Sequence, residues 1–213
     1  MPLTLYFLRH GQTASSRDDT FCGSGLDPEL TAEGRAMAEA FAHAYRSTPW
    51  AAVYSSPLVR TVETARALSE RLNLDVERRD GLKEIAYGAW EGLTREAVDR
   101  DFHDDYLRWV ADPAWNAPTG GERGIMIARR LAEVIAEIVQ QVPDGPVLAV
   151  SHKAAIRIAL ASLLGIDVAR FRQRFACPVA SVTIVEFGPQ GPQLRALADR
   201  SHLPQALREL PGT

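Results

Sequence analysis

The chain contains little cysteine, no long apolar run and no excess of basic residues, and each absence excludes a class of protein. Its 213 residues include only Cys22 and Cys177, which are too few for a disulfide framework and are predicted to be free thiols. No segment offers the roughly 18 consecutive apolar residues that a membrane span requires, so we expect no membrane partner. The formal net charge of −3 argues against a nucleic-acid partner, because such proteins need a basic surface.

The overall composition of the chain is typical of a globular protein. Hydrophobic residues make up 46% of the chain and charged residues 24%, and its 213 residues suit one domain spanning 1–213. The first residues, Met1-Pro2-Leu3, lead directly into an apolar stretch and show no secretory signal. We therefore predict a single domain and a cytoplasmic location.

Short apolar stretches alternate with helical periods along the chain, which indicates an α/β fold. Strands are predicted at Leu3–Leu8, Ala51–Tyr54 and Val147–Val150, and a terminal hairpin at Val179–Phe187 and Gln193–Leu197. Helices are predicted from an N-cap at Thr31 to Pro49, from an N-cap at Ser56 with Pro57 in first position, over 122–142, and over Lys153–Leu164. The pattern predicts a three-layer α/β/α sandwich with a mainly parallel central sheet and an antiparallel hairpin.

Two segments interrupt this alternation. Residues 11–30 are rich in Gly, Ser, Asp and Thr and are predicted to form a long loop. Residues 88–121 lose the helical period and contain Trp90, Trp109 and Trp115 among several prolines and glycines. We predict that this 88–121 segment is a lid over a site, with Trp109 and Trp115 packed within it.

His43, His103 and His202 belong to no motif and are predicted to be surface or capping residues.

Two of the predicted strands lead into a histidine, His10 and His152. In open α/β sheets, ligands bind outside the carboxyl ends of the strands, so the two histidines are expected to meet there. The helix predicted at Lys153 would direct its N-terminal N–H groups to the same place, which favours a bound phosphate. Arg9 and Arg60 would add bidentate donors. A cationic pocket in an acidic protein concentrates small anions.

Each of these motifs has an ordinary structural explanation when taken alone. Arg9-His10-Gly11 fits a strand-end turn, His152 a buried core histidine, and Glu84 a surface carboxylate. Their joint occurrence, in order and each at a strand end or helix start, favours a catalytic site.

Together these motifs resemble those of the histidine phosphatase superfamily, the phosphoglycerate-mutase-like proteins, over nearly the whole chain. The matching residues are Leu8 to Thr13, Asp27, Leu30-Thr31, Gly34, Ser55 to Leu58, Arg60-Thr61, Thr64-Ala65, Leu82, Glu84, Gly88, Trp90 to Gly92, Gly120 to Glu122, Val150 to His152 and Ile156-Arg157. The resemblance implies the same sandwich fold and phosphoryl transfer without metal or other cofactor.

The resemblance also assigns roles to the motif residues. It implies that His10 is the phosphorylated nucleophile, that Arg9, Arg60 and His152 hold the phosphoryl oxygens, and that Glu84 is the proton donor. Imidazole can attack phosphorus, and cationic clamps can stabilise the transferring group. Substrate contacts are expected from a further set: Gln12, Thr13, Ser16, Cys22, Gly23, Tyr87 and Lys153.

Three positions depart from the family pattern. Lys153 follows His152 where glycine is usual, and it either faces solvent or adds a cation to the substrate mouth. Ser16 replaces a common asparagine that touches phosphate. Arg123 follows Gly120-Gly121-Glu122 where serine is common, and it either binds an acidic substrate or is solvated. Lys153 and Arg123 together favour a substrate that carries a carboxylate.

The resemblance leaves three activities to compare. Hydrolysis of a small phosphorylated metabolite, of the phosphoserine, phosphoglycerate or sugar phosphate type, ranks first. A phosphoglycerate mutase ranks second, because mutases of this family follow the acid with Arg-His-Tyr-Gly and this chain has Ile85-Ala86-Tyr87-Gly88 after Glu84. A non-catalytic phosphate-binding regulatory module ranks last, because it would be expected to lose His10, His152 or Glu84. Relatives are often dimers, so a homodimer is expected.

Overall fold

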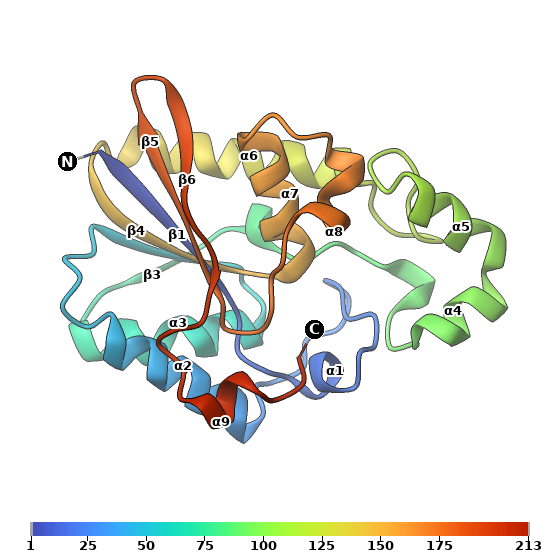
Figure 1. The fold of residues 1–213 in the computed structure, drawn as a ribbon, viewed down its shortest axis with the longest axis horizontal. Coiled ribbons are helices and arrows are strands. Elements are labelled where there is room, and N and C mark those ends of the chain that lie inside the picture. Colours follow the sequence, from blue (N-terminus) through green and yellow to red (C-terminus); the bar gives the residue numbers. More distant parts are fainter. Residues whose placement is uncertain (1, 213) are drawn as a thin grey trace.

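The computed structural model describes residues 2–212, which build a six-stranded sheet with helices on both faces (Figure 1). The strands are β1 (Leu3–Arg9), β2 (Ala52–Ser55), β3 (Val76–Arg78), β4 (Gly145–Ser151), β5 (Val182–Gly188) and β6 (Gly191–Asp199). Their order in the sheet is β3-β2-β4-β1-β5-β6. The first four are parallel, whereas β5 runs antiparallel to β1 and β6 antiparallel to β5. The predicted fold class is confirmed.

Two helices cover each face of the sheet because its strands are apolar on both sides. The helices are α2 (Ala32–Ala44) and α3 (Val59–Leu72) on one face, and α6 (Gly124–Gln141) and α7 (Lys153–Leu163) on the other. In β4, Val147 and Ala149 pack in the core under α6 and α7, whereas Leu148 and Val150 pack under α2 and α3. This alternation is the two-residue period of a strand.

The predicted start of the helix after β2 was wrong. Ser56 is not its N-cap, because α3 begins at Val59 after Leu58 and has no side-chain cap of its own. Asp27 caps it from a distance, since its Oδ1 accepts a hydrogen bond of 2.8 Å from the N–H of Val59. The loop before α2 is thereby attached to the start of α3.

Several smaller elements differ from the predictions. The predicted loop 11–30 contains the short helix α1 (Ala14–Arg17), capped by Thr13, whereas the predicted Thr31 cap of α2 is present. The elements that were not predicted are β3, α8 (Phe171–Arg174), α9 (Gln205–Arg208) and the 3₁₀ turns Asp80–Leu82, Gly88–Trp90 and Val168–Arg170. No helix among residues 2–212 combines the length and the apolar character needed to cross a membrane.

The 88–121 segment is more regular than predicted. It contains α4 (Arg95–Asp101) and α5 (His103–Ala111), which lie to one side of the sheet in Figure 1. Trp90 and Trp109 are buried in a separate aromatic cluster with Phe21 from the 11–30 loop. Trp115 is 62% exposed, so its predicted packing was wrong. The lid role stays a prediction.

The C-terminal segment returns to the start of the chain. The side-chain amide of Gln12 donates a hydrogen bond of 2.6 Å to the carbonyl of Pro211. His202 is half-buried against the rings of Phe41 and Tyr45, so its predicted surface position was wrong. The segment that follows β6 therefore packs on α2 and on the loop after β1.

Candidate active site

The sheet register brings His10 and His152 together. Arg9 of β1 pairs with Ser151 of β4, and the N–H of His10 donates to the Ser151 carbonyl at 3.1 Å. The two imidazole rings lie edge to face, with their centroids 5.2 Å apart. The predicted meeting of two strand-end histidines is confirmed.

His10 has the protonation state that a nucleophile needs. Its Nδ1 lies 2.8 Å from the Gly11 carbonyl, which can only accept, so Nδ1 carries the hydrogen and Nε2 keeps a lone pair. The side chain is 5% exposed. Burial, together with the positive charges of Arg60 and Arg9, holds the pKa of His10 well below its ordinary value. The imidazole is therefore neutral at physiological pH.

Gly11 fixes the backbone that carries this imidazole. A Cβ at position 11 would lie 2.3 Å from the carbonyl oxygen of Gly34, so no larger residue fits without displacing backbone. The N–H of Gly11 donates to Thr64 Oγ1 at 3.1 Å. The strand-end turn is thus held between the first turn of α2 and the second turn of α3.

His152 is completely buried and engages both ring nitrogens. Its Nδ1 accepts from Arg60 Nε at 3.3 Å, so Nε2 carries the hydrogen and donates to Ser56 Oγ at 2.8 Å. Burial and the charge of Arg60 hold its pKa well below the ordinary value. In this arrangement His152 orients the Arg60 guanidinium.

Arg60 is only 1% exposed, and backbone carbonyls fix its other two nitrogens. Nη1 donates to the carbonyl of Leu26 at 2.8 Å and Nη2 to that of Gly23 at 3.0 Å. Asp27 adds an ion pair at 3.6 Å. A Cβ at position 23 would lie 2.3 Å from the carbonyl of Ile85, which explains the glycine there. Gly23 therefore acts through its backbone, as a support for Arg60.

Arg9 is buried at the end of β1. Its Nη1 donates to the carbonyl of Cys177 at 2.7 Å. Within residues 2–212 its buried Nε has no hydrogen-bond partner. An unpaired buried donor is costly, and an anionic ligand would satisfy it.

Glu84 lies at the N-terminus of α7. Its Oε1 accepts from the N–H groups of Ile85 at 3.0 Å and Ala155 at 3.1 Å, and its Oε2 accepts from that of Ala154 at 3.1 Å. These three bonds hold a buried carboxyl group at the start of α7, the helix that follows His152.

A second carboxylate and an arginine support the segment that carries Glu84. Arg130 of α6 donates to the carbonyls of Gly81 at 2.8 Å, Lys83 at 2.7 Å and Glu84 at 3.1 Å. Glu122 forms an ion pair with Arg130 at 3.1 Å. Glu122 of the Gly-Gly-Glu motif therefore supports the backbone that carries Glu84 through its ion pair with Arg130.

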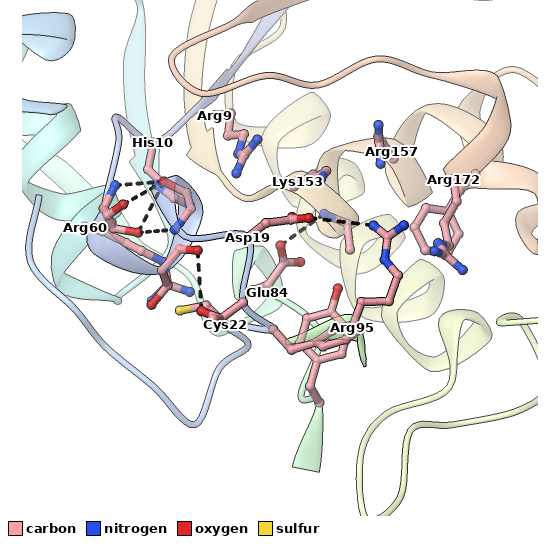
Figure 2. Close-up of a pocket in the computed structure, with 18 of the residues that line it drawn as sticks. Arg9, His10, Asp19, Cys22, Arg60, Glu84, Arg95, Lys153, Arg157 and Arg172 are labelled. Atoms are coloured by element: carbon pink, nitrogen blue, oxygen red, sulfur yellow. Dashed lines mark hydrogen bonds and ion pairs between the residues drawn. The ribbon is translucent and has the colours of Figure 1, made fainter. Parts of the chain in front are cut away.

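Arg9, His10, Arg60 and Glu84 line a cavity of about 380 Å³ (Figure 2). His10 and Arg60 lie at one end, Arg157 and Arg172 at the other, and Glu84 and Lys153 between them. The other predicted site residues that line it are Thr13, Ser16, Cys22 and Tyr87.

Three predicted site residues, His152, Gln12 and Gly23, do not belong to this lining. Gln12 is buried outside the cavity, where its amide group bonds to Pro211 and to the hydroxyl of Thr31. Like His152 and Gly23, it supports the cavity wall.

Lys153 and Arg123 were each expected either to face solvent or to contact the substrate, and the structure places them differently. Lys153 lines the cavity, where burial and the neighbouring Arg9 and Arg157 lower its pKa to about 8. Arg123 is exposed at the N-cap of α6 and lies outside the cavity, so a substrate contact from it is not supported.

Burial also changes the acidity of two other lining residues. It raises the pKa of the Cys22 thiol and, together with the nearby Glu84, that of the Tyr87 hydroxyl. Both groups therefore stay neutral at physiological pH, and Cys22 offers no thiolate in the cavity.

The sequence reasoning did not assign the outer cations to the site, although Arg157 was among the motif residues. Arg95, Arg157 and Arg172 all line the cavity. Arg157 was detectable, because it follows Lys153 by one helical turn in a predicted helix. Arg172 lies on an unpredicted helix, with its guanidinium carbon 4.1 Å from the ring centroid of Trp109. Arg95 forms an ion pair of 3.8 Å with Asp19, which also lines the cavity.

Comparison with known proteins places this geometry among phosphatases. A family model described as histidine phosphatase superfamily (branch 1) matches residues 5–200. Phosphoserine phosphatase 1 of Hydrogenobacter thermophilus is 31% identical over 181 residues, which cover 85% of each chain. Glucosyl-3-phosphoglycerate phosphatase of Mycobacterium tuberculosis is 36% identical over 175 residues, 78% of each chain. The solved structure of Bacillus stearothermophilus YhfR matches with a TM-score of 0.87 at 26% identity, covering 94% of this chain and 98% of its own.

Proposed function

Because the chain belongs to the histidine phosphatase superfamily, we propose that it hydrolyses a small phosphorylated metabolite through a phosphohistidine at His10. The observation that carries this mechanism is the neutral, buried imidazole of His10, whose Nε2 lone pair is free of the proton held on Nδ1. It lies in a cavity shared with Arg9, Arg60 and Glu84.

The reaction divides into two displacements at phosphorus. In the first, Nε2 of His10 forms a bond to phosphorus as the ester P–O bond breaks, and the acid form of Glu84 gives its proton to the departing alkoxide. In the second, water attacks the phosphohistidine, ionised Glu84 takes the water proton, and the N–P bond breaks. Phosphate leaves, and both residues return to their starting forms.

Two arginines supply the charge that the transferring group requires. The negative charge lies on the equatorial oxygens of the phosphoryl group, so fixed cations lower the barrier without a proton transfer. Arg9 offers its unpaired Nε, and Arg60 is held in place by His152 and two backbone carbonyls. His152 thus acts on the phosphoryl site through Arg60.

The test combines turnover with trapping of the intermediate. Steady-state hydrolysis of p-nitrophenyl phosphate is expected to continue in the presence of EDTA. Quenching with base during turnover of a ³²P-labelled substrate is expected to leave acid-labile label on a peptide containing His10. Absence of that label, or loss of turnover in EDTA, contradicts the mechanism. Interconversion of 2- and 3-phosphoglycerate faster than phosphate release would identify a mutase instead.

We also propose that the 88–121 segment covers the cavity as a lid. Trp109 and Val110 of α5 line the cavity, and Trp109 packs on Phe21 of the 11–30 loop. Vanadate, a phosphate analogue, is expected to slow amide hydrogen exchange in α4 and α5. Unchanged exchange there would contradict the lid.

Three further proposals concern the whole chain. We propose that residues 1–213 fold as one domain, that the protein is a homodimer, and that it is cytoplasmic. The exposed Leu194 and Leu197 on the edge strand β6 support a dimer contact there. A single calorimetric unfolding transition, a dimer mass in sedimentation equilibrium, and recovery from the cytosolic fraction are the expected results.

A further inference from the structure

The cavity carries more positive charge than one phosphate group can neutralise. Among the described residues that line it, six are cationic and two acidic: Arg9, Arg60, Arg95, Lys153, Arg157 and Arg172 against Asp19 and Glu84. This is an excess of four positive charges when both carboxyl groups are ionised. A phosphate dianion balances two of them, and the remainder lies at the outer end, away from His10 (Figure 2).

Within residues 2–212, the side chains of three cations in the cavity have no hydrogen-bond or ion-pair partner. Lys153 and Arg157 are one turn apart on α7 and share a face of that helix. Across residues 2–212, no hydrogen bond or ion pair engages the side chains of Lys153, Arg157 or Arg172, and Nε of Arg157 is buried without a partner. Arg172 is held flat against Trp109. Partly buried, unpaired cations are unfavourable unless a ligand supplies the counter-charge.

Their position identifies the part of the substrate that they face. Glu84, which protonates the departing oxygen, is bonded to the N–H groups of Ala154 and Ala155 at the start of α7. Arg157 follows on the same helix, one turn beyond Lys153. Cations of α7 therefore lie on the side of the alcohol that leaves, and the phosphoryl group is on the side of Arg9 and Arg60.

We propose that Arg157, together with Lys153 and Arg172, binds a second anionic group on the alcohol part of the substrate. This inference rests on the proposed function and narrows it to phosphomonoesters with a carboxylate or second phosphate. A neutral sugar phosphate would leave the outer cations unpaired. Planar guanidinium groups suit either anion, because they donate two parallel hydrogen bonds.

The experiment compares substrates that differ only in the second group. 3-Phosphoglycerate and glycerol 3-phosphate differ by a carboxylate against a hydroxymethyl group, and in glycerol 1,3-bisphosphate that hydroxymethyl group carries a second phosphate. We expect kcat/KM for at least one of the two doubly anionic substrates to exceed that for glycerol 3-phosphate by about tenfold or more, as one charge-assisted contact provides. The better of the two identifies the second group as carboxylate or phosphate.

Substitution then assigns the contact. Arg157→Gln is expected to lower kcat/KM for the preferred substrate by a factor about 10- to 100-fold larger than the factor for glycerol 3-phosphate or p-nitrophenyl phosphate. Arg172→Gln provides a second variant, and Arg157→Lys is expected to restore part of the preference. Arg123→Gln is the matched control, because Arg123 is exposed outside the cavity.

Equal kcat/KM values for the three substrates, or an equal loss on all of them in both variants, would overturn the inference. Failure of the proposed function has a different signature, since no phosphomonoester would then be hydrolysed. In that case calorimetry with the same compounds decides, because the inference requires tighter binding of a doubly anionic compound than of glycerol 3-phosphate. Equal affinities would overturn it.

Discussion

The two ends of the cavity are built in opposite ways. At the inner end, His152 and two backbone carbonyls fix Arg60, and three backbone N–H groups fix Glu84. Toward the outer end, Lys153 and then Arg157 follow on one helix without such bonds within residues 2–212. Preorganised donors suit a group with one geometry, the phosphoryl group. Adjustable cations suit the variable part of a substrate.

The largest effect is expected from removing His10, the proposed nucleophile at the inner end. His10→Asn keeps a hydrogen-bonding side chain but has no nitrogen that can attack phosphorus. We expect kcat for p-nitrophenyl phosphate to fall by ~10⁴-fold or more, as for other lost nucleophiles. Circular dichroism checks the fold of the variant. Turnover within tenfold of the unmodified protein would show that the inner end works without covalent catalysis.

Glu84→Gln is expected to have the next largest effect, and the effect depends on the leaving group. The amide cannot give a proton to an alkoxide, so kcat/KM for glycerol 3-phosphate is expected to fall by about 10²- to 10⁴-fold. p-Nitrophenolate leaves without a proton, so its kcat/KM is expected to fall much less. Equal losses on both substrates would mean that Glu84 acts through structure, as a support for the start of α7.

A smaller effect is expected when the support of the inner end is removed. Arg130→Met deletes the three bonds to the segment that carries Glu84 while keeping a long apolar side chain. We expect kcat to fall by about 10- to 100-fold, since misplacing a catalytic group by about 1 Å has that effect. Arg129→Met, an exposed neighbour, is the control. A change confined to KM would contradict the positioning role.

The smallest effect concerns pH at the outer end. The pKa of Lys153 is about 8 because burial, Arg9 and Arg157 lower it more than Asp19 and Cys177 raise it. Its positive charge is present at pH 7 and is lost as the pH rises through 8. KM for 3-phosphoglycerate is therefore expected to rise severalfold between pH 7 and 9, and less so for glycerol 3-phosphate.

Lys153→Met removes the titrating group and is expected to flatten this pH dependence. A profile that keeps its rise in the variant would assign the titration to another group. We expect no loss of activity from protonation of His10 when the pH falls to 6.5, because the lowered pKa of His10 keeps its imidazole neutral there.

The inner end was predictable from sequence and the outer end only in part, for physical reasons. His10 and His152 directly follow short apolar strands, so strand pairing alone determines where they meet. Arg172 reaches the cavity through a four-residue helix, whose place depends on packing against Trp109 and not on any local pattern. Sequence periodicity contains no information of that kind.

The incorrect predictions have similar causes. Ser56 has the chemistry of an N-cap, yet Asp27, far away in sequence, caps α3, and Ser56 is engaged by His152. The helix Arg95–Asp101 is short and mostly polar, so its period was hidden among prolines and glycines. Local propensity is overridden where distant residues satisfy the same hydrogen bonds.

The pairing of β1 with β4 links activity to the completion of folding. His10 is synthesised well before Ser151, because the strand β4 that pairs with β1 follows it far along the chain. Contacts of such long range form late. A nascent or partly refolded chain therefore contains His10 before β4 has paired with β1. Recovery of turnover during refolding is expected to coincide with that pairing.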